Sequence, residues 1–81
     1  MTNRIITIQP KGTAQLRSYD CQLVMVGNIR TYVLDNTSQN LSDLAPGCKV
    51  FADSILYRIK EIWYSPDSKY LFLNVYRNLS V

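Results

Sequence analysis

Histidine is absent from this 81-residue sequence, and cysteine, glycine and proline are scarce. Without histidine, general acid–base catalysis would have to use carboxylates, lysine, tyrosine or the two cysteines. The carboxylates occur singly, beside turns or within predicted strands. The sequence also contains no glycine-rich phosphate loop, no serine elbow and no paired-carboxylate spacing. These absences predict a protein that is not an enzyme.

The two cysteines, Cys21 and Cys48, lie far apart in the sequence and form no CxxC motif. No histidine could complete a set of metal ligands around them, so we expect no metal and no cofactor. Both cysteines fall within or beside predicted strands. We interpret them as small apolar core residues of a reduced protein, with a single disulfide as the alternative.

Length and composition predict one small domain over residues 1–81, with 47% hydrophobic and 19% charged residues. A chain of this length buries only about 60% of its unfolded surface, so its stability margin should be thin. The net charge is +3, and its basic residues are spread evenly, which suits a weak attraction to nucleic acid or to an acidic protein. No apolar run approaches the roughly 18 residues of a membrane helix, and the N-terminus has no signal-peptide core. We therefore expect no membrane contact.

Alternation of apolar and polar residues, interrupted by turn residues, predicts about six short strands. The expected strands are Arg4–Gln9, Thr13–Asp20, Cys21–Val26, Arg30–Leu34, Cys48–Ala52, Ile55–Tyr64 and Tyr70–Arg77, the second running on into the third. The expected turns are Pro10–Gly12, Gly27-Asn28, Asp53-Ser54 and a type I turn over Ser65–Ser68. Between Thr13 and Asp20 the period of two indicates a half-buried strand, whereas Cys21–Val26 is apolar on both faces, as a central strand would be.

Two local features refine this pattern. After Ile59 the apolar positions shift by one residue, so that Ile62 rather than Glu61 continues the apolar face; this predicts a β-bulge or a sharp bend. The polar stretch Asp35–Leu44 is the only segment that is not β-like, and its leucines predict one short helical turn near residues 38–44 that pins the loop to the core. The sequence thus predicts an all-β fold, a small SH3-like or OB-like antiparallel barrel.

The candidate interaction surface lies on the last two predicted strands, where aromatic and basic side chains are concentrated. Its residues are Arg58, Lys60, Trp63, Tyr64, Tyr70, Phe72, Tyr76 and Arg77. An exposed face of this kind could bind a protein partner, or could stack nucleic-acid bases while cations contact phosphates. The plainer interpretation is that the aromatic rings only cover the barrel, because tyrosine fits a half-buried pleated surface.

The sequence from Arg30 to Arg77 also carries a pattern of strands and turns. It runs from a Tyr-Val strand through a turn glycine to an aromatic strand, a Pro-Asp turn and a Leu-x-Leu strand. The residues of this pattern are Tyr32, Val33, Leu44, Gly47, Val50, Tyr57, Ile59, Ile62, Pro66, Asp67, Leu71 and Leu73. The pattern resembles the head–tail joining (head completion) proteins of tailed bacteriophages and covers a little over half of the chain. The sequence differs from those proteins in having Cys48, where a polar residue is usual, and in having no N-terminal helix.

This resemblance implies a virion structural protein, a connector or tail completion ring, that assembles in the host cytoplasm and stays in the virion. Its implied partners are further copies of itself in a ring, the neighbouring portal, connector or tail proteins, and DNA through weak non-specific contact. Similar barrels serve in tails, baseplates and capsid decoration. The sequence leaves two alternatives: a small OB-like protein that binds single-stranded nucleic acid, and a small phage-encoded inhibitor of a host protein.

Overall fold

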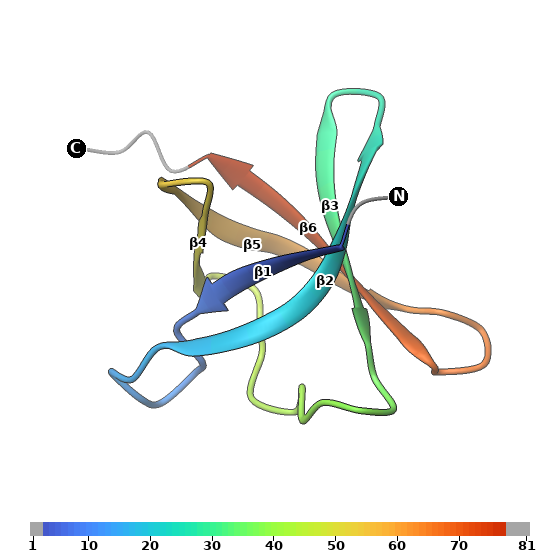
Figure 1. Cartoon of the computed structure of the whole chain (residues 1–81), viewed down its shortest axis with the longest axis horizontal. Helices are drawn as coiled ribbons and strands as arrows, with labels where there is room; N and C mark the ends of the chain where they lie inside the picture. Colours follow the sequence, from blue (N-terminus) through green and yellow to red (C-terminus); the bar gives the residue numbers. More distant parts are fainter. Residues whose placement is uncertain (1–2, 78–81) are drawn as a thin grey trace.

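Six antiparallel strands form one closed barrel in the computed structural model, which describes residues 3–77 (Figure 1). The strands are β1 (Asn3–Ile8), β2 (Arg17–Val26), β3 (Ile29–Asp35), β4 (Lys49–Ala52), β5 (Ile55–Tyr64) and β6 (Tyr70–Arg77). Their order around the barrel is β1-β2-β3-β6-β5-β4, and every neighbouring pair is antiparallel. The predicted all-β barrel is therefore confirmed. Among residues 3–77, no helix has the length and apolar character needed to cross a membrane.

The barrel consists of two three-stranded meanders, β1–β3 and β4–β6, joined edge to edge. Because β4 lies beside β1 and β6 beside β3, the loop of residues 36–48 must connect opposite sides of the barrel. Figure 1 shows this loop in green and yellow-green, passing below the strands. The same order places β1 opposite β6, β2 opposite β5 and β3 opposite β4. Outward-facing residues on opposed strands therefore point to opposite sides of the molecule.

Alternate residues of each strand fill the interior, as the period of two requires. The largest fully buried side chains are Tyr32, Ile6, Ile8, Leu34, Ile59, Leu71, Leu73 and Val50. Between Ile59 and Glu61 the pairing of β5 with β6 shifts by one residue, so the predicted β-bulge is confirmed, with Lys60 as the extra residue. This bulge keeps Ile62 packed against the core after the shift.

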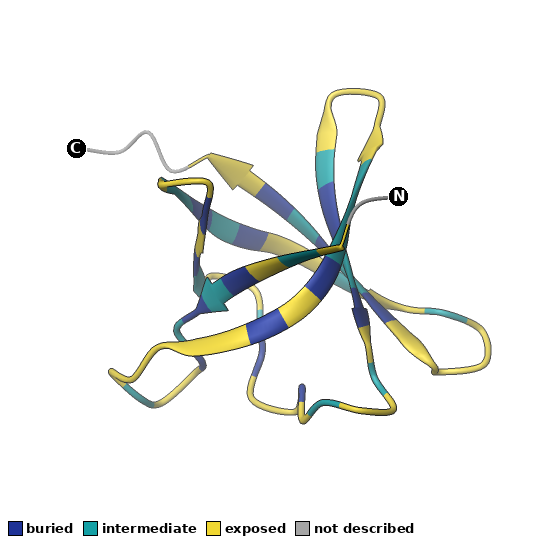
Figure 2. Ribbon diagram, viewed as in Figure 1, coloured by how far each residue is buried: buried dark blue, intermediate teal, exposed yellow. Residues whose placement is uncertain are grey.

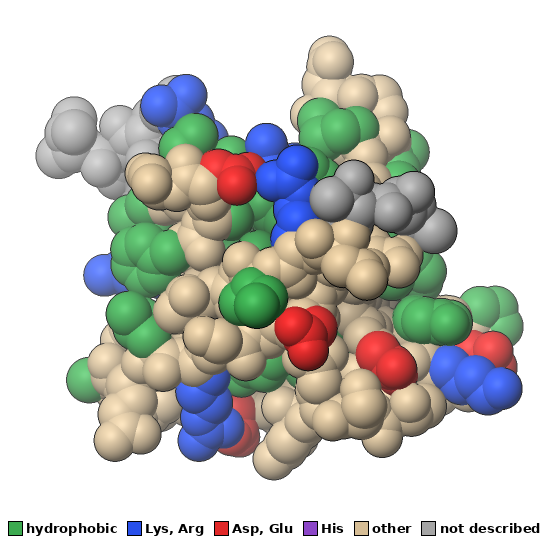
Figure 3. Space-filling view, in the orientation of Figure 1, with side chains coloured by type: hydrophobic (Ala, Val, Ile, Leu, Met, Phe, Trp, Pro, Cys, Tyr) green, Lys and Arg blue, Asp and Glu red, His purple; other side chains and the backbone are tan. Residues whose placement is uncertain are grey.

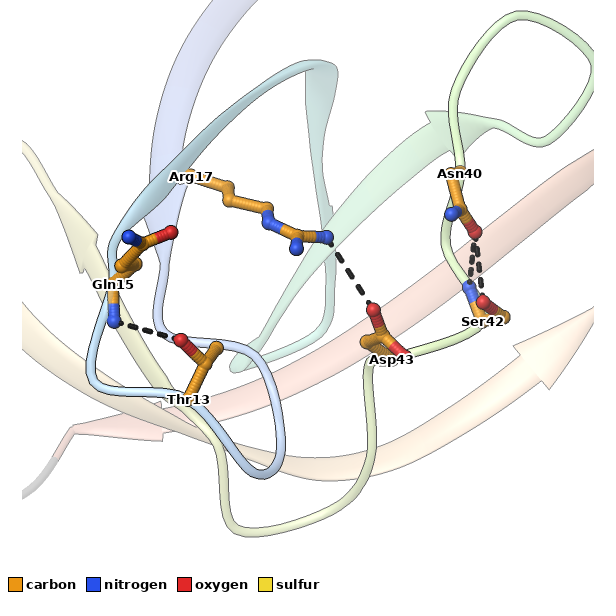
Figure 4. Close-up of polar contacts among 6 residues, drawn as sticks. All are labelled: Thr13, Gln15, Arg17, Asn40, Ser42 and Asp43. Atoms are coloured by element: carbon orange, nitrogen blue, oxygen red, sulfur yellow. Dashed lines mark hydrogen bonds and ion pairs between the residues drawn. The ribbon is translucent and has the colours of Figure 1, made fainter.

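The loop of residues 36–48 contains no helix. Of the helical or 3₁₀ turn expected near residues 38–44, a single turn of the 3₁₀ type is present, in which the N–H of Leu44 donates to the carbonyl of Leu41, three residues earlier, at 3.2 Å. The side chain of Asn40 fixes the start of this turn. Its Oδ1 accepts hydrogen bonds from the N–H of Ser42 at 3.2 Å and from the Ser42 hydroxyl at 2.8 Å (Figure 4). Both leucines are nevertheless buried, so they pin the loop to the core as expected.

β2 begins at Arg17, later than the predicted strand start at Thr13. The intervening residues form an irregular segment in which Leu16 is 54% exposed, and the buried face begins with Tyr19 and Cys21. The strand cannot start earlier because its partner β1 ends at Ile8, which lies opposite Arg17.

Polar contacts fix the irregular segment before β2 to the crossing loop, as Figure 4 shows. The N–H of Gln15 donates to the hydroxyl oxygen of Thr13 at 3.1 Å. Arg17 then pairs with Asp43 at 3.3 Å between Nη1 and Oδ2. Both charged side chains are about half exposed, so this pair positions the loop more than it stabilises the fold.

The outer end of β2 leaves the barrel. Among the described residues, β1 pairs with β2 only as far as Gln22, and β6 pairs with β3 only from Arg30 onward. The β2–β3 tip therefore projects as a two-stranded hairpin, drawn as exposed at the top of Figure 2. Val26 is 60% exposed and Met25 is exposed as well, so the expectation that Cys21–Val26 is a central strand is wrong for its second half.

The reversal between β4 and β5 is the predicted two-residue turn, Asp53-Ser54. Its φ angles are 53° and 64°, and positive values at both central positions define a type I′ turn. Neither residue is a glycine, so both adopt a left-handed conformation that costs free energy in residues with a side chain.

Replacing Ser54 by glycine is expected to raise the free energy of unfolding by about 0.5–1 kcal/mol, because glycine adopts positive φ without steric cost. Urea unfolding followed by circular dichroism would measure the change. The same substitution at Ser18, within β2, should lower the free energy of unfolding by a similar amount. A loss of stability in Ser54→Gly would contradict the prediction.

Candidate protein-binding surface

The residues predicted for the interaction surface all lie on β5 and β6, but they do not form one patch. Trp63 lies directly opposite Phe72 near the turn that joins the two strands. Arg58 lies directly opposite Tyr76 near the other end of the hairpin. The predicted surface therefore divides into an apolar part around Trp63 and a basic part around Arg58.

The remaining predicted residues lie outside both pairs. Lys60, at the bulge, and Arg77 line a hollow at the open end of the barrel, beside the β2–β3 tip. Tyr70 lies opposite Asp35 and faces the β2–β3 side, while Tyr64 is exposed at the end of β5. The aromatic residues of β6 share one face, as predicted, but their neighbours on the adjacent strands differ from one end to the other.

An apolar hollow of about 250 Å³ lies over the outer face of β3, β5 and β6 and reaches the β2–β3 tip. It is lined by Val26, Ile29, Thr31, Trp63, Phe72 and Asn74, and we call it the Trp63 hollow. Trp63 is 56% exposed, although it is the largest side chain of the chain. No charged side chain is among the described residues that line the hollow.

The polar groups of the Trp63 hollow are engaged with one another. The buried hydroxyl of Thr31 donates to Oδ1 of Asn74 at 2.9 Å. The indole N–H of Trp63 donates to Oε2 of Glu61 at 2.9 Å, which fixes the ring beside Phe72. What remains accessible is mainly hydrocarbon. Such a surface suits an apolar side chain of a protein partner, since tryptophan beside a desolvated pocket is typical of binding hot spots.

Four residues that line this hollow are not among those predicted from the sequence: Val26, Ile29, Thr31 and Asn74. A sequence signal for the first two exists, because the expected strand run of residues 13–26 is much longer than the expected first strand, Arg4–Gln9. A strand that is longer than its neighbour must project beyond it, and its last apolar residues are then exposed.

Arg30 covers the open end of the barrel. Its guanidinium lies over the ring of Tyr57, at 5.0 Å from the ring centroid. Its Nη1 donates to the hydroxyl of Tyr32 at 2.8 Å and lies 3.7 Å from Oδ2 of Asp53. Burial raises the pKa of Tyr32 above its ordinary value, while the bond from Arg30 opposes that rise. The hydroxyl is therefore neutral near pH 7, and the cluster serves as a structural cap.

Both cysteines are free thiols in the structure, so the alternative of a disulfide is not realised. Cys21 is buried, and this burial raises the pKa of its thiol to about 11. A thiol that stays protonated near pH 7 is a poor nucleophile. The described residues include no cluster of three or more metal-ligating side chains.

Comparison of the chain with protein-family models, with curated proteins and with solved structures gives no match. The phage resemblance therefore stays a prediction.

Proposed function

We propose that this protein is a non-enzymatic structural protein that assembles by protein–protein contacts, each copy holding an apolar side chain of the next copy in its Trp63 hollow. The observation that carries this proposal is the hollow itself. It has an apolar lining, an exposed tryptophan and polar groups that are already hydrogen-bonded. Exposure of such a surface in so small a domain favours a partner that covers it.

A complementary apolar side chain is available on the opposite side of the barrel. Ile5, on the outer face of β1, is 70% exposed, the highest value among the large hydrophobic residues described. In the middle of the face that carries β1 and β2, Figure 3 shows a hydrophobic group that is surrounded by polar and charged atoms. An isolated side chain of this kind can enter a hollow of the size found beside Trp63.

The positions of Ile5 and the hollow determine the kind of assembly. Because β1 lies opposite β6, a contact between Ile5 of one copy and the hollow of the next is head-to-tail. Head-to-tail contacts form rings when their rotation closes. A joining ring between the head and the tail of a virion, in contact with portal, connector or tail proteins, is the specific role that the phage resemblance supports.

Size-exclusion chromatography with light scattering would test this proposal. The wild-type protein is expected to form an oligomer larger than a dimer, and the apolar contact should persist at high salt. Ile5→Lys and Trp63→Lys should each give monomers, since one removes the inserted side chain and the other the wall of the hollow. Leu16→Lys, at another exposed aliphatic residue, is the matched control and should leave the oligomer intact.

Mixing the two variants sharpens the test. Ile5→Lys retains an intact hollow, and Trp63→Lys retains an intact Ile5. An equimolar mixture should therefore form a 1:1 dimer with a single working contact and nothing larger, because each variant lacks one of the two contact surfaces. A wild-type protein that stays monomeric at high concentration, or a mixture that contains only monomers, would overturn the proposal.

A further inference from the structure

A second surface lies on the side of the barrel formed by β4, β5 and the end of β6. Lys49, Arg58 and Tyr76 occupy one row across these three strands, each directly opposite the next. The side chains of Val50, Tyr57, Ile59 and Val75, which adjoin them along the strands, are buried in the core, so the three side chains point outward. Two cations and an aromatic ring therefore lie side by side on one outer face.

A groove of about 410 Å³ continues this row toward the crossing loop. Lys11 from the turn after β1, together with Lys49 and Arg58, contributes all the charged side chains that line it, and none of the lining residues is a carboxylate. The Arg58 Nη1 donates to the carbonyl of Gly47 at 2.9 Å. This bond holds the guanidinium at the edge of the groove and leaves its other donors for a ligand.

The charges of the groove are not neutralised within the described residues. The ion pairs among residues 3–77 involve Arg4, Arg17 and Arg30. None of them involves Lys11, Lys49 or Arg58. Asp43 accepts a backbone hydrogen bond from Lys11 at 2.9 Å, but its carboxylate is paired with Arg17.

The opposite side of the barrel carries the contrary charge. Asp20 on β2 and Asp35 on β3 line a separate hollow there, and these strands lie opposite β5 and β4. A polyanion that approaches the molecule is therefore attracted to the groove side and repelled from the other.

Exposed aromatic rings accompany these cations. Tyr76 lies beside Arg58, and Phe51 follows Lys49 as the next outward residue of β4. Cations that track a phosphate backbone, together with rings on which bases stack, form the usual surface for single-stranded nucleic acid. An acidic peptide would use the cations but not the ring faces.

The geometry points to a binding site for single-stranded nucleic acid on this face, which we call the basic strip: Lys11, Lys49, Phe51, Arg58 and Tyr76. Lys11, Lys49 and Arg58 contact phosphates, and Tyr76 and Phe51 stack against bases. The site is separate from the Trp63 hollow, because Phe72 and Trp63 lie toward the other end of the β5–β6 hairpin. A copy of the protein can therefore bind nucleic acid whether or not it assembles.

Fluorescence anisotropy with a labelled oligothymidylate of about 16 nucleotides would test this site. If the three cations each neutralise one phosphate, log K should fall against log salt with a slope of about −2. Lys49→Ala combined with Arg58→Gln should weaken binding at least about tenfold at low salt and reduce the slope to about −0.7. Glutamine keeps a donor for the carbonyl of Gly47 while removing the charge. Lys11→Ala changes an exposed turn residue and gives a second test that touches no strand.

Stacking is tested separately. Tyr76→Ala should weaken binding about fivefold or more with an unchanged salt slope, while Tyr70→Ala, on the same strand but opposite Asp35 and outside both surfaces, should bind as the wild type does. Lys69→Ala removes the same charge from the β5–β6 turn and is the control for the lysine variants.

Three outcomes would overturn the assignment. The first is no binding of the oligothymidylate at about 50 mM salt. The second is an equal loss of affinity in Lys69→Ala, which would show attraction to net charge alone. The third combines two results: inorganic polyphosphate competes as strongly as unlabelled oligothymidylate, and Tyr76→Ala binds as the wild type does. Together they would show that the strip binds phosphate and not bases.

Discussion

Leu73→Ala is expected to lower the free energy of unfolding by about 2–5 kcal/mol, through lost burial and the cavity left behind. Leu73 is completely buried, and on β6 it lies between Tyr32 of β3 and Ile62 of β5. At about 0.05–0.15 kcal/mol per residue, a chain of 81 residues has a total stability of about 4–12 kcal/mol. The variant should therefore lose a large part of its stability, measured as a lower midpoint in urea unfolding.

Leu16→Ala is the matched control for this prediction. It removes the same atoms from a leucine that is 54% exposed in the irregular segment before β2. Its effect on the free energy of unfolding should stay within about 0.5 kcal/mol. Equal losses in the two variants would contradict the burial of Leu73 and the late start of β2.

The second large effect is expected at the open end of the barrel. Arg30→Met keeps an unbranched side chain but removes the donor to the buried hydroxyl of Tyr32. A buried hydroxyl without a partner costs about 1–3 kcal/mol, and we expect a loss of that size in the free energy of unfolding. The contact between Arg30 and Asp53 adds little, because Asp53 is half exposed and the two atoms are 3.7 Å apart.

A double-mutant cycle with Tyr32→Phe would isolate this hydrogen bond. Tyr32→Phe leaves Arg30 without its hydroxyl partner, and the double variant removes both polar groups together. Its loss of stability should be smaller than the sum of the two single losses by about 0.5–3 kcal/mol. Strict additivity would show that Arg30 closes the barrel only by packing over Tyr57.

The strands and turns could largely be predicted from the sequence because their signals are local. Asp53-Ser54 interrupts two alternating runs, and the shift after Ile59 directly records the bulge. Leu71, Leu73 and Val75 share a buried face because strand periodicity alone decides which side they occupy. None of these features depends on which strands become neighbours.

Features that depend on strand neighbours could not be predicted in the same way. Val26 lies beyond Gln22, the last residue of β2 that pairs with β1 among the described residues, and it is exposed. The division of the candidate interaction surface depends on strand neighbours in the same way. Phe72 and Tyr76 look equivalent along β6, but one faces Trp63 and the other faces Arg58. Sequence alone does not supply this pairing, so it does not separate the Trp63 hollow from the basic strip.

The place of β6 between β3 and β5 has a consequence for how the chain folds during synthesis. The ribosome makes residues 3–35 first, and they can pair as a meander while β3 still has an open edge. That edge stays open until residues 70–77 emerge, because only β6 covers it. An open edge can pair with another nascent chain, so crowded polysomes favour exchange of β6 between copies. Closure of the barrel thus depends on the last strand to be translated among those described.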